Sequence, residues 1–178
     1  IMDFYSIVSE VSPKRISQDI NRLANFGTRH TLSEKVSDQR GIGAATRWIY
    51  SEFIKISDLC NGCIEVMYVS YSVSGESRIP SLTEIVNVIA IQRGSERPND
   101  FVMMSGDIDS RVTDPLDGIS DSPGANDNAS GMAGVLEAAR VLSRREYAGS
   151  IIYAGLSGEE QGLFGGKIVA QHAIKQGW

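Results

Sequence analysis

The second half of the chain alternates strand-like with helix-like segments, and this order constrains the fold more than any other feature. Residues 101–104 and 150–156 are short apolar runs typical of buried strands. Residues 133–142 and 163–176 follow them with the spacing and composition of helices. Because strand, loop, helix, strand, loop, helix is the order of parallel α/β units, the sequence predicts an α/β fold with a mostly parallel central sheet flanked by helices.

The first half predicts two more helices and two more strands. Ser12-Pro13 is a typical helix start, and apolar residues continue at helical spacing as far as Gly27. A second helix is predicted over residues 43–56. Strands are predicted over residues 63–73 and 84–93, joined by a turn with Gly and Pro. A length of 178 residues fits one domain, so the expected organisation is a single domain, residues 1–178.

The net charge of −5 comes mostly from one segment. Residues 100–127 contain seven Asp and a single basic residue, Arg111, and part of this segment forms a long loop without apolar periodicity. Loops of that length inside a compact domain are usually functional or disordered. An acidic chain without a basic stripe does not suit a nucleic acid, and no apolar run approaches the roughly 20 residues that cross a bilayer. Neither nucleic acid nor membrane is expected as a partner.

Acidic residues follow both predicted strands of the second half. Asp107 and Asp109 come after the first strand, Glu159 and Glu160 after the second, and Asp127 precedes the helix between them. The carboxyl ends of parallel strands form the edge of the sheet where ligands bind. Because acids gathered at one edge repel each other unless a cation or shared protons neutralise them, the arrangement predicts a metal site.

The acidic motifs resemble those of the co-catalytic dizinc exopeptidases of metallopeptidase family twenty-eight, which includes aminopeptidases and glutamate carboxypeptidases. The segments that resemble the family's motifs are Pro123-Gly124-Ala125-Asn126-Asp127-Asn128-Ala129-Ser130-Gly131 and Glu159-Glu160-Gln161-Gly162-Leu163. They stand in the family's order and spacing across residues 102–170. The resemblance implies a zinc exopeptidase-like three-layer sandwich, a peptide substrate and two zinc ions.

The resemblance also implies a role for each acid. Asp127 would bridge both zinc ions through a carboxylate next to a cis peptide bond, Glu160 would bind one ion, and Glu159 would be the general base that activates water. Asp109 would orient the ligand two residues before it. That ligand position holds Asp107, where the family has His. A carboxylate coordinates zinc at about 2 Å, but it adds negative charge and favours harder ions.

The family's remaining ligands, an Asp and a His, lie farther downstream than Trp178. The expectation is therefore a truncated catalytic domain, incomplete at its C-terminus, impaired in activity and binding zinc partly or not at all. The alternatives are a metal-free homologue that acts through protein contacts, or ligands supplied by a partner chain. Missing strands would leave an exposed sheet edge and promote self-association. Resemblance to secreted members suggests a secreted or periplasmic protein.

Several residues have simpler interpretations. His30 is expected to be structural and His172 exposed. Cys60 and Cys63 form a lone Cys-x-x-Cys, which predicts either a local disulfide or two free thiols. The other acids of the acidic segment, Asp100, Asp114, Asp117 and Asp121, are expected to be solvated. A glycosidase that uses Asp127 and Glu159 as paired carboxylates stays open, although only the acids themselves support it.

Overall fold

The computed structural model describes residues 4–178, in which helices alternate with strands. Its helices are α1 (Phe4–Ser9), α2 (Pro13–Ala24), α3 (Gly41–Leu59), α4 (Ser130–Leu142) and α5 (Phe164–Gln176), with a π-helical turn η1 (Ala125–Ala129) directly before α4. Its strands are β1 (Ile64–Val73), β2 (Thr83–Gln92), β3 (Arg97–Asp107) and β4 (Gly149–Leu156). All predicted helices and strands are present, and α1 is an addition too short to show a helical period.

The four strands form one mixed sheet in the order β1-β2-β4-β3. The predicted parallel pairing is found between β3 and β4, whereas β1 pairs with β2 and β2 with β4 in antiparallel orientation. The α/β class is thus confirmed, but the described sheet is mixed rather than mostly parallel. The reason is the short turn between β1 and β2, because a parallel pair needs a crossover connection of a dozen or more residues.

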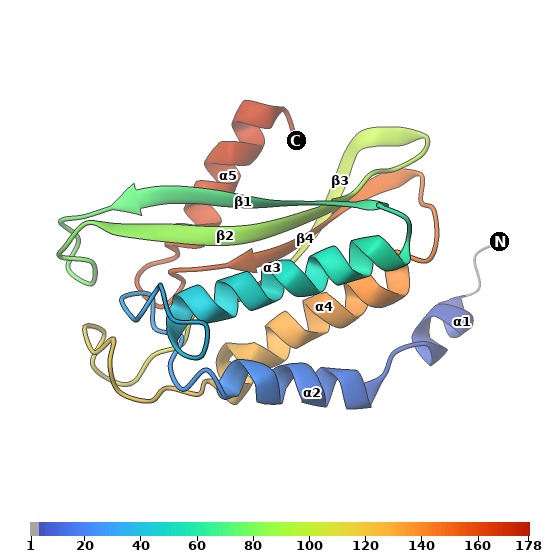
Figure 1. The fold of residues 1–178 in the computed structure, drawn as a ribbon. Helices are drawn as coiled ribbons and strands as arrows, with labels where there is room; N and C mark the ends of the chain where they lie inside the picture. Colours follow the sequence, from blue (N-terminus) through green and yellow to red (C-terminus); the bar gives the residue numbers. More distant parts are fainter. Residues whose placement is uncertain (1–3) are drawn as a thin grey trace.

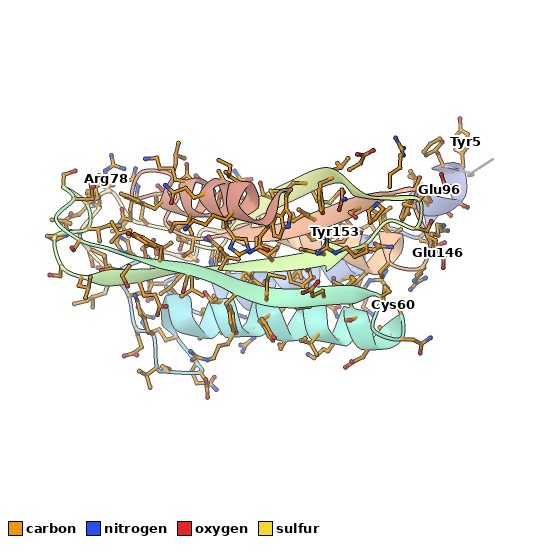
Figure 2. The ribbon with its side chains drawn as sticks, turned by 90° about the horizontal axis from the view of Figure 1, so that it is seen from above. Tyr5, Cys60, Arg78, Glu96, Glu146 and Tyr153 are labelled. Carbon is orange, nitrogen blue, oxygen red and sulfur yellow. A yellow bond between two sulfur atoms is a disulfide. The ribbon has the colours of Figure 1, made fainter. Side chains whose placement is uncertain are left out.

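Helices cover both faces of this sheet, as the three-layer prediction required. Figure 1 shows α2, α3 and α4 on one face and α5 on the other. Two apolar clusters fill the interfaces, one beneath α3 and α4 and one beneath α5. Tyr153 of β4 is fully buried near the centre of the molecule (Figure 2), and its hydroxyl donates to Gln92 Oε1 at 2.9 Å.

A buried carboxylate fixes α2 against α4. Glu137, 2% exposed, accepts the Ser12 N–H at 2.7 Å and the Arg15 Nη2 and Nε donors at 2.9 and 3.0 Å. Arg140 lies beside it and pairs with Asp19 at 2.6 Å. Ser12 is the predicted N-cap, since its hydroxyl accepts the Arg15 N–H at 3.3 Å. This network holds the first half of α2 against α4.

The turn from α3 to β1 contains the disulfide Cys60–Cys63, one of the two outcomes predicted for this pair. Cys60, Glu96 and Glu146 lie at one end of the molecule, while Arg78 lies at the opposite end (Figure 2). β3 is an edge strand in the described sheet, with Val102 and Met103 exposed. No helix within residues 4–178 is both long and apolar enough to span a membrane.

Candidate metal centre

The two strands that precede the acidic segments end side by side. Asp107, the last residue of β3, is in register with Leu156, the last residue of β4, and the Ile108 N–H donates to the Leu156 carbonyl at 2.6 Å. The turn η1 with Asp127 leads into α4 beside the end of β3. The structure thus brings the three acidic segments to one edge of the sheet, as the strand order predicted.

Asp109 is the buried centre of this edge. Its carboxylate, in a side chain only 1% exposed, accepts the N–H groups of Glu159 and Glu160 at 3.2 and 3.1 Å and the Thr31 hydroxyl at 3.0 Å. Burial raises the pKa of Asp109 to about 7, although these hydrogen bonds oppose the rise. Asp109 therefore positions the main chain of the loop that carries both glutamates. Its orientation of a ligand at position 107 stays a prediction.

The acids assigned to the metals influence one another electrostatically. Burial raises the pKa of Asp107, and the negative charges of Asp127 and Glu160 raise it further. Burial also raises the pKa of Glu159, with the charges of Asp107, Glu160 and Asp127 acting in the same direction and Arg111 opposing them. Mutual repulsion of this kind is what a bound cation relieves.

The fit of this edge to a metal ion is partial. Arg111 Nε lies 2.5 Å from Glu160 Oε2, so an arginine already neutralises one proposed ligand. Within residues 4–178, no three or more His, Cys, Asp or Glu side chains are grouped closely enough to hold a metal. The donor set consists of carboxylate oxygens, which zinc accepts but harder ions prefer. The residues present supply part of a metal site.

The backbone before α4 bends sharply around Asp127. The Asp127-Asn128 peptide bond is cis, as the resemblance implied. Asn128 Oδ1 accepts the Asp107 N–H at 3.3 Å, which links η1 to the end of β3. Gly131 allows this approach, since a Cβ there would lie 2.0 Å from Asn128 Oδ1. The sequence alone assigned no role to Asn128. Its position in the motif of residues 123–131 was the only indication that it belongs to the site.

Arg29 was not predicted as a site residue, yet it holds three segments together from within the protein. Its side chain is fully buried and donates to the carbonyls of Ile108, Pro123 and Gly124 at 2.8, 2.6 and 3.0 Å, and to Leu23 at 3.0 Å. Burial lowers its pKa to about 10. The loops after β3 and before η1 therefore share one buried guanidinium.

The two histidines differ in burial and in their contacts. The His30 ring is buried, Nδ1 accepts the Leu32 N–H at 3.0 Å and Nε2 lies 3.1 Å from the Pro115 carbonyl, so the structural role predicted for it agrees with its contacts. His172 is half-buried and packs edge-on against Trp178 at 5.2 Å between ring centroids, so the prediction that it is exposed was wrong. Among residues 4–178, neither histidine joins a group that could hold a metal.

The remaining acids of the long loop form hydrogen bonds and an ion pair within or next to this loop. Asp117 accepts the N–H groups of Ile119 and Ser120, and its hydrogen bonds with Ser120 are the main reason that its pKa falls to about 2. Asp114 accepts the Leu116 N–H at 2.9 Å, and Asp121 pairs with Arg40. These side chains are exposed or half-buried, in keeping with the prediction of a solvated loop.

The fold places this chain among proteins with the zinc-exopeptidase fold. The sequence model of the peptidase family M28 matches residues 87–177, just over half of the chain. The chain belongs to this family.

Curated relatives are named as zinc proteases. A probable zinc metalloprotease of Pyrenophora teres f. teres is 49% identical over 166 residues, which cover 93% of this chain and 34% of that protein. One from Leptosphaeria maculans is 45% identical over 168 residues, covering 94% of this chain and 39% of that protein. The chain thus spans little more than a third of the length of these relatives.

Solved structures agree on the fold. LapB of Legionella pneumophila matches with a TM-score of 0.73 at 22% identity, over 97% of this chain and 42% of that one. The LapA aminopeptidase of the same organism gives 0.73 at 19% identity, over 96% and 41%. A glutaminyl cyclase of Fimbriiglobus ruber gives 0.72 at 17% identity, over 93% and 56%. At these identities the likeness concerns the fold alone.

Proposed function

We propose that the chain is part of a zinc-dependent exopeptidase of the aminopeptidase type, which hydrolyses peptide bonds with an activated water. The observation that carries this proposal is the meeting of Asp107, Asp127, Glu159 and Glu160 around one sheet edge in a member of peptidase family M28. Relatives named as probable zinc metalloproteases support the choice of zinc.

In this proposal Asp107, Asp127 and Glu160 hold the metal, and two ions are expected once the site is complete. Bound zinc supplies Lewis acidity that polarises the peptide carbonyl. Glu159 accepts a proton from the attacking water and returns it to the leaving amine. Asp109 accepts the Glu159 N–H at 3.2 Å and so fixes the main chain from which the Glu159 carboxylate extends.

The second candidate is a metal-free homologue that acts through protein contacts. The observation that favours it is the Arg111–Glu160 pair, because an arginine that neutralises Glu160 takes the place of a cation. Both candidates agree that these 178 residues alone bind zinc weakly or not at all. Two tightly held zinc ions per chain would contradict that expectation.

The test uses the complete gene product, its zinc content, and its hydrolysis of amino-acid 4-nitroanilides. Stoichiometric zinc with turnover is expected, and absence of both would favour the metal-free homologue. Glu159→Gln should lower kcat by about 10²–10⁴-fold with zinc retained, since it removes the general base. Glu146→Gln, an exposed glutamate at the far end of the molecule, is the matched control (Figure 2). Unchanged kcat in Glu159→Gln would remove Glu159 from the mechanism.

Position 107 requires a separate test. Asp107→His restores the residue that the family carries and removes a negative charge, so zinc should bind more tightly to the complete product. The measurement is competition with a chelator of known zinc affinity. Unchanged affinity would show that position 107 is not a ligand.

We further propose that the protein works in an oxidising compartment, outside the cell or in a periplasm. The Cys60–Cys63 disulfide supports this proposal, because disulfides persist where thiols are not kept reduced. Thiol labelling of the protein isolated without reductant should leave both cysteines unlabelled.

A further inference from the structure

A cavity of about 280 Å³ opens beside the acidic edge on the side of α3. Ile42 of α3, Tyr68 of β1 and Val86 of β2 form an apolar wall. Thr31 and Ser157 line the side nearest the acidic edge. The volume is slightly below the roughly 300 Å³ at which pockets for drug-sized ligands begin, so the cavity suits a smaller molecule.

The walls are fixed by contacts of their own. Arg47 donates to the carbonyls of Lys35, Val36 and Ser37 at 2.8, 3.1 and 2.6 Å, which holds the loop before α3. Gly43 lets that loop approach the helix, since a Cβ there would lie 2.1 Å from the Lys35 carbonyl oxygen. On the other side, the Tyr68 ring stacks on that of Tyr50 with centroids 4.4 Å apart. The cavity is therefore preformed.

Three polar groups of this cavity retain unused hydrogen-bonding capacity. The Ser157 hydroxyl, in a residue only 2% exposed, makes no hydrogen bond within residues 4–178. Lys35 Nζ donates to the Glu84 main-chain carbonyl at 2.8 Å, which uses one of its three donors, and the charge of the Glu84 carboxylate acts on it. Glu84 Oε1 accepts the Ser70 hydroxyl at 2.9 Å, and its other carboxylate oxygen has no donor among those residues. An ammonium, a carboxylate and the hydroxyl of a largely buried serine thus line one small apolar cavity.

We propose that this cavity binds a free α-amino acid with a branched apolar side chain, such as leucine. The ligand carboxylate would accept from Lys35 Nζ, and its ammonium group would donate to the Glu84 carboxylate. Its side chain would pack against Ile42, Tyr68 and Val86, and the Ser157 hydroxyl would bond to one of the polar groups. Charge-assisted hydrogen bonds at both ends give this class an advantage over purely apolar or singly charged molecules.

The cavity shares one residue with the positioning of the acidic edge. Thr31 lines the cavity, and its hydroxyl donates to Asp109, which in turn accepts the N–H groups of Glu159 and Glu160. The binding proposal does not depend on peptidase activity, because it concerns different side chains and is measured without turnover.

The test is isothermal titration calorimetry of the protein with three probes: leucine, 4-methylpentanoate, which lacks the amino group, and 3-methylbutylamine, which lacks the carboxylate. Leucine should bind saturably and more tightly than either analogue. Lys35→Gln should weaken leucine and 4-methylpentanoate by about tenfold, the loss of one charge-assisted hydrogen bond, and leave 3-methylbutylamine unchanged. Glu84→Gln should weaken leucine and 3-methylbutylamine and spare 4-methylpentanoate.

Lys167→Gln is the matched control, because Lys167 Nζ also donates to one main-chain carbonyl, that of Gly162 at 2.9 Å, outside the cavity. It should leave all three affinities unchanged. Both Lys35 and Glu84 are exposed, so their amide variants should unfold at the wild-type temperature, which a thermal scan verifies. The proposal is wrong if leucine shows no saturable heat up to about 10 mM, well above millimolar dissociation constants. It is equally wrong if Lys35→Gln changes all three probes alike or changes none.

Discussion

Glu137 offers a direct test of how α2 is held against α4. Its Oε1 accepts the Ser12 N–H and Arg15 Nη2, and its Oε2 accepts Arg15 Nε at 3.0 Å and faces Arg140 Nη1 at 3.4 Å. Glu137→Gln keeps the shape of the side chain and one acceptor oxygen. Its amide nitrogen would then point at two donors of Arg15 and Arg140, so the variant loses an acceptor and leaves Arg15 without its buried counter-charge, whereas Arg140 keeps Asp19 and Glu52.

The expected loss follows from the burial of the two partners. Removing one member of a fully buried ion pair costs about 3–5 kcal/mol. The Arg15 side chain is 38% exposed, so water replaces part of the lost interaction. The expected loss therefore falls below the lower end of that range. We expect Glu137→Gln to lower the free energy of unfolding by about 2 kcal/mol, close to one charge-assisted hydrogen bond. For a chain of this length that corresponds to roughly 4–8 °C in Tm.

The measurement is urea denaturation followed by circular dichroism at pH 7. Glu65→Gln is the control, because Glu65 and Arg93 form an exposed pair at 3.7 Å and should change the free energy of unfolding by at most about 0.5 kcal/mol. A double-mutant cycle of Glu137→Gln with Arg15→Met should give a coupling of at least about 1 kcal/mol. A loss below about 0.5 kcal/mol in Glu137→Gln would refute the argument.

The same pair has a defined pH dependence. Burial raises the pKa of Glu137, but hydrogen bonds from Arg15 and the Ser12 N–H outweigh it, so the folded pKa lies below the usual value. A carboxyl with a lowered folded pKa stabilises the protein above its unfolded pKa and loses that contribution as the pH falls through the folded pKa. The difference between wild type and Glu137→Gln should therefore shrink below about pH 4.

Two further predictions concern residues near the acidic edge. Burial lowers the pKa of His30, so the unfolded state binds more protons below about pH 6.5, and wild type should lose stability from pH 7.5 to 5.5 more steeply than His30→Asn. An equal slope in wild type and His30→Asn would contradict the prediction. Gly106→Ala should cost about 1–3 kcal/mol in urea denaturation, because its Cβ would lie 2.6 Å from the Met132 main-chain nitrogen. Gly134→Ala, in open space on α4, should instead stabilise by about 0.5–1 kcal/mol, and a loss there would show that crowding is not the cause.

The sequence predicted the elements and the acidic edge because both depend on local patterns. Asp107 and Glu159 directly follow apolar strands, and the carboxyl ends of parallel strands meet at one edge, so their proximity required no knowledge of side-chain contacts. The ligand and base roles depend on residue-by-residue resemblance, and they remain proposals until zinc and turnover are measured.

Contacts between distant segments could not be predicted in the same way. Arg29 bonds to main-chain carbonyls about 80 and 95 residues away, and any residue type offers such a carbonyl. The antiparallel pairing of β2 with β4 was missed because apolar periodicity shows which face of a strand is buried, not which strand lies beside it. His172 packs against Trp178, which lies six residues later and just beyond the end of α5. Because Trp178 is outside the helix, the helical spacing of residues does not predict this contact.

The strand order also determines when the sheet can close during synthesis. The β1–β2 hairpin is complete at Gln92, but the neighbour of β2 on its other side begins only at Gly149. At about 5–20 residues per second, a ribosome needs roughly 3–11 s to make the intervening segment. During that interval β2 has an open apolar edge that invites pairing with another nascent chain. Chaperones that bind extended apolar segments should therefore engage this protein while translation lies between these two strands, and release it once β4 has left the exit tunnel.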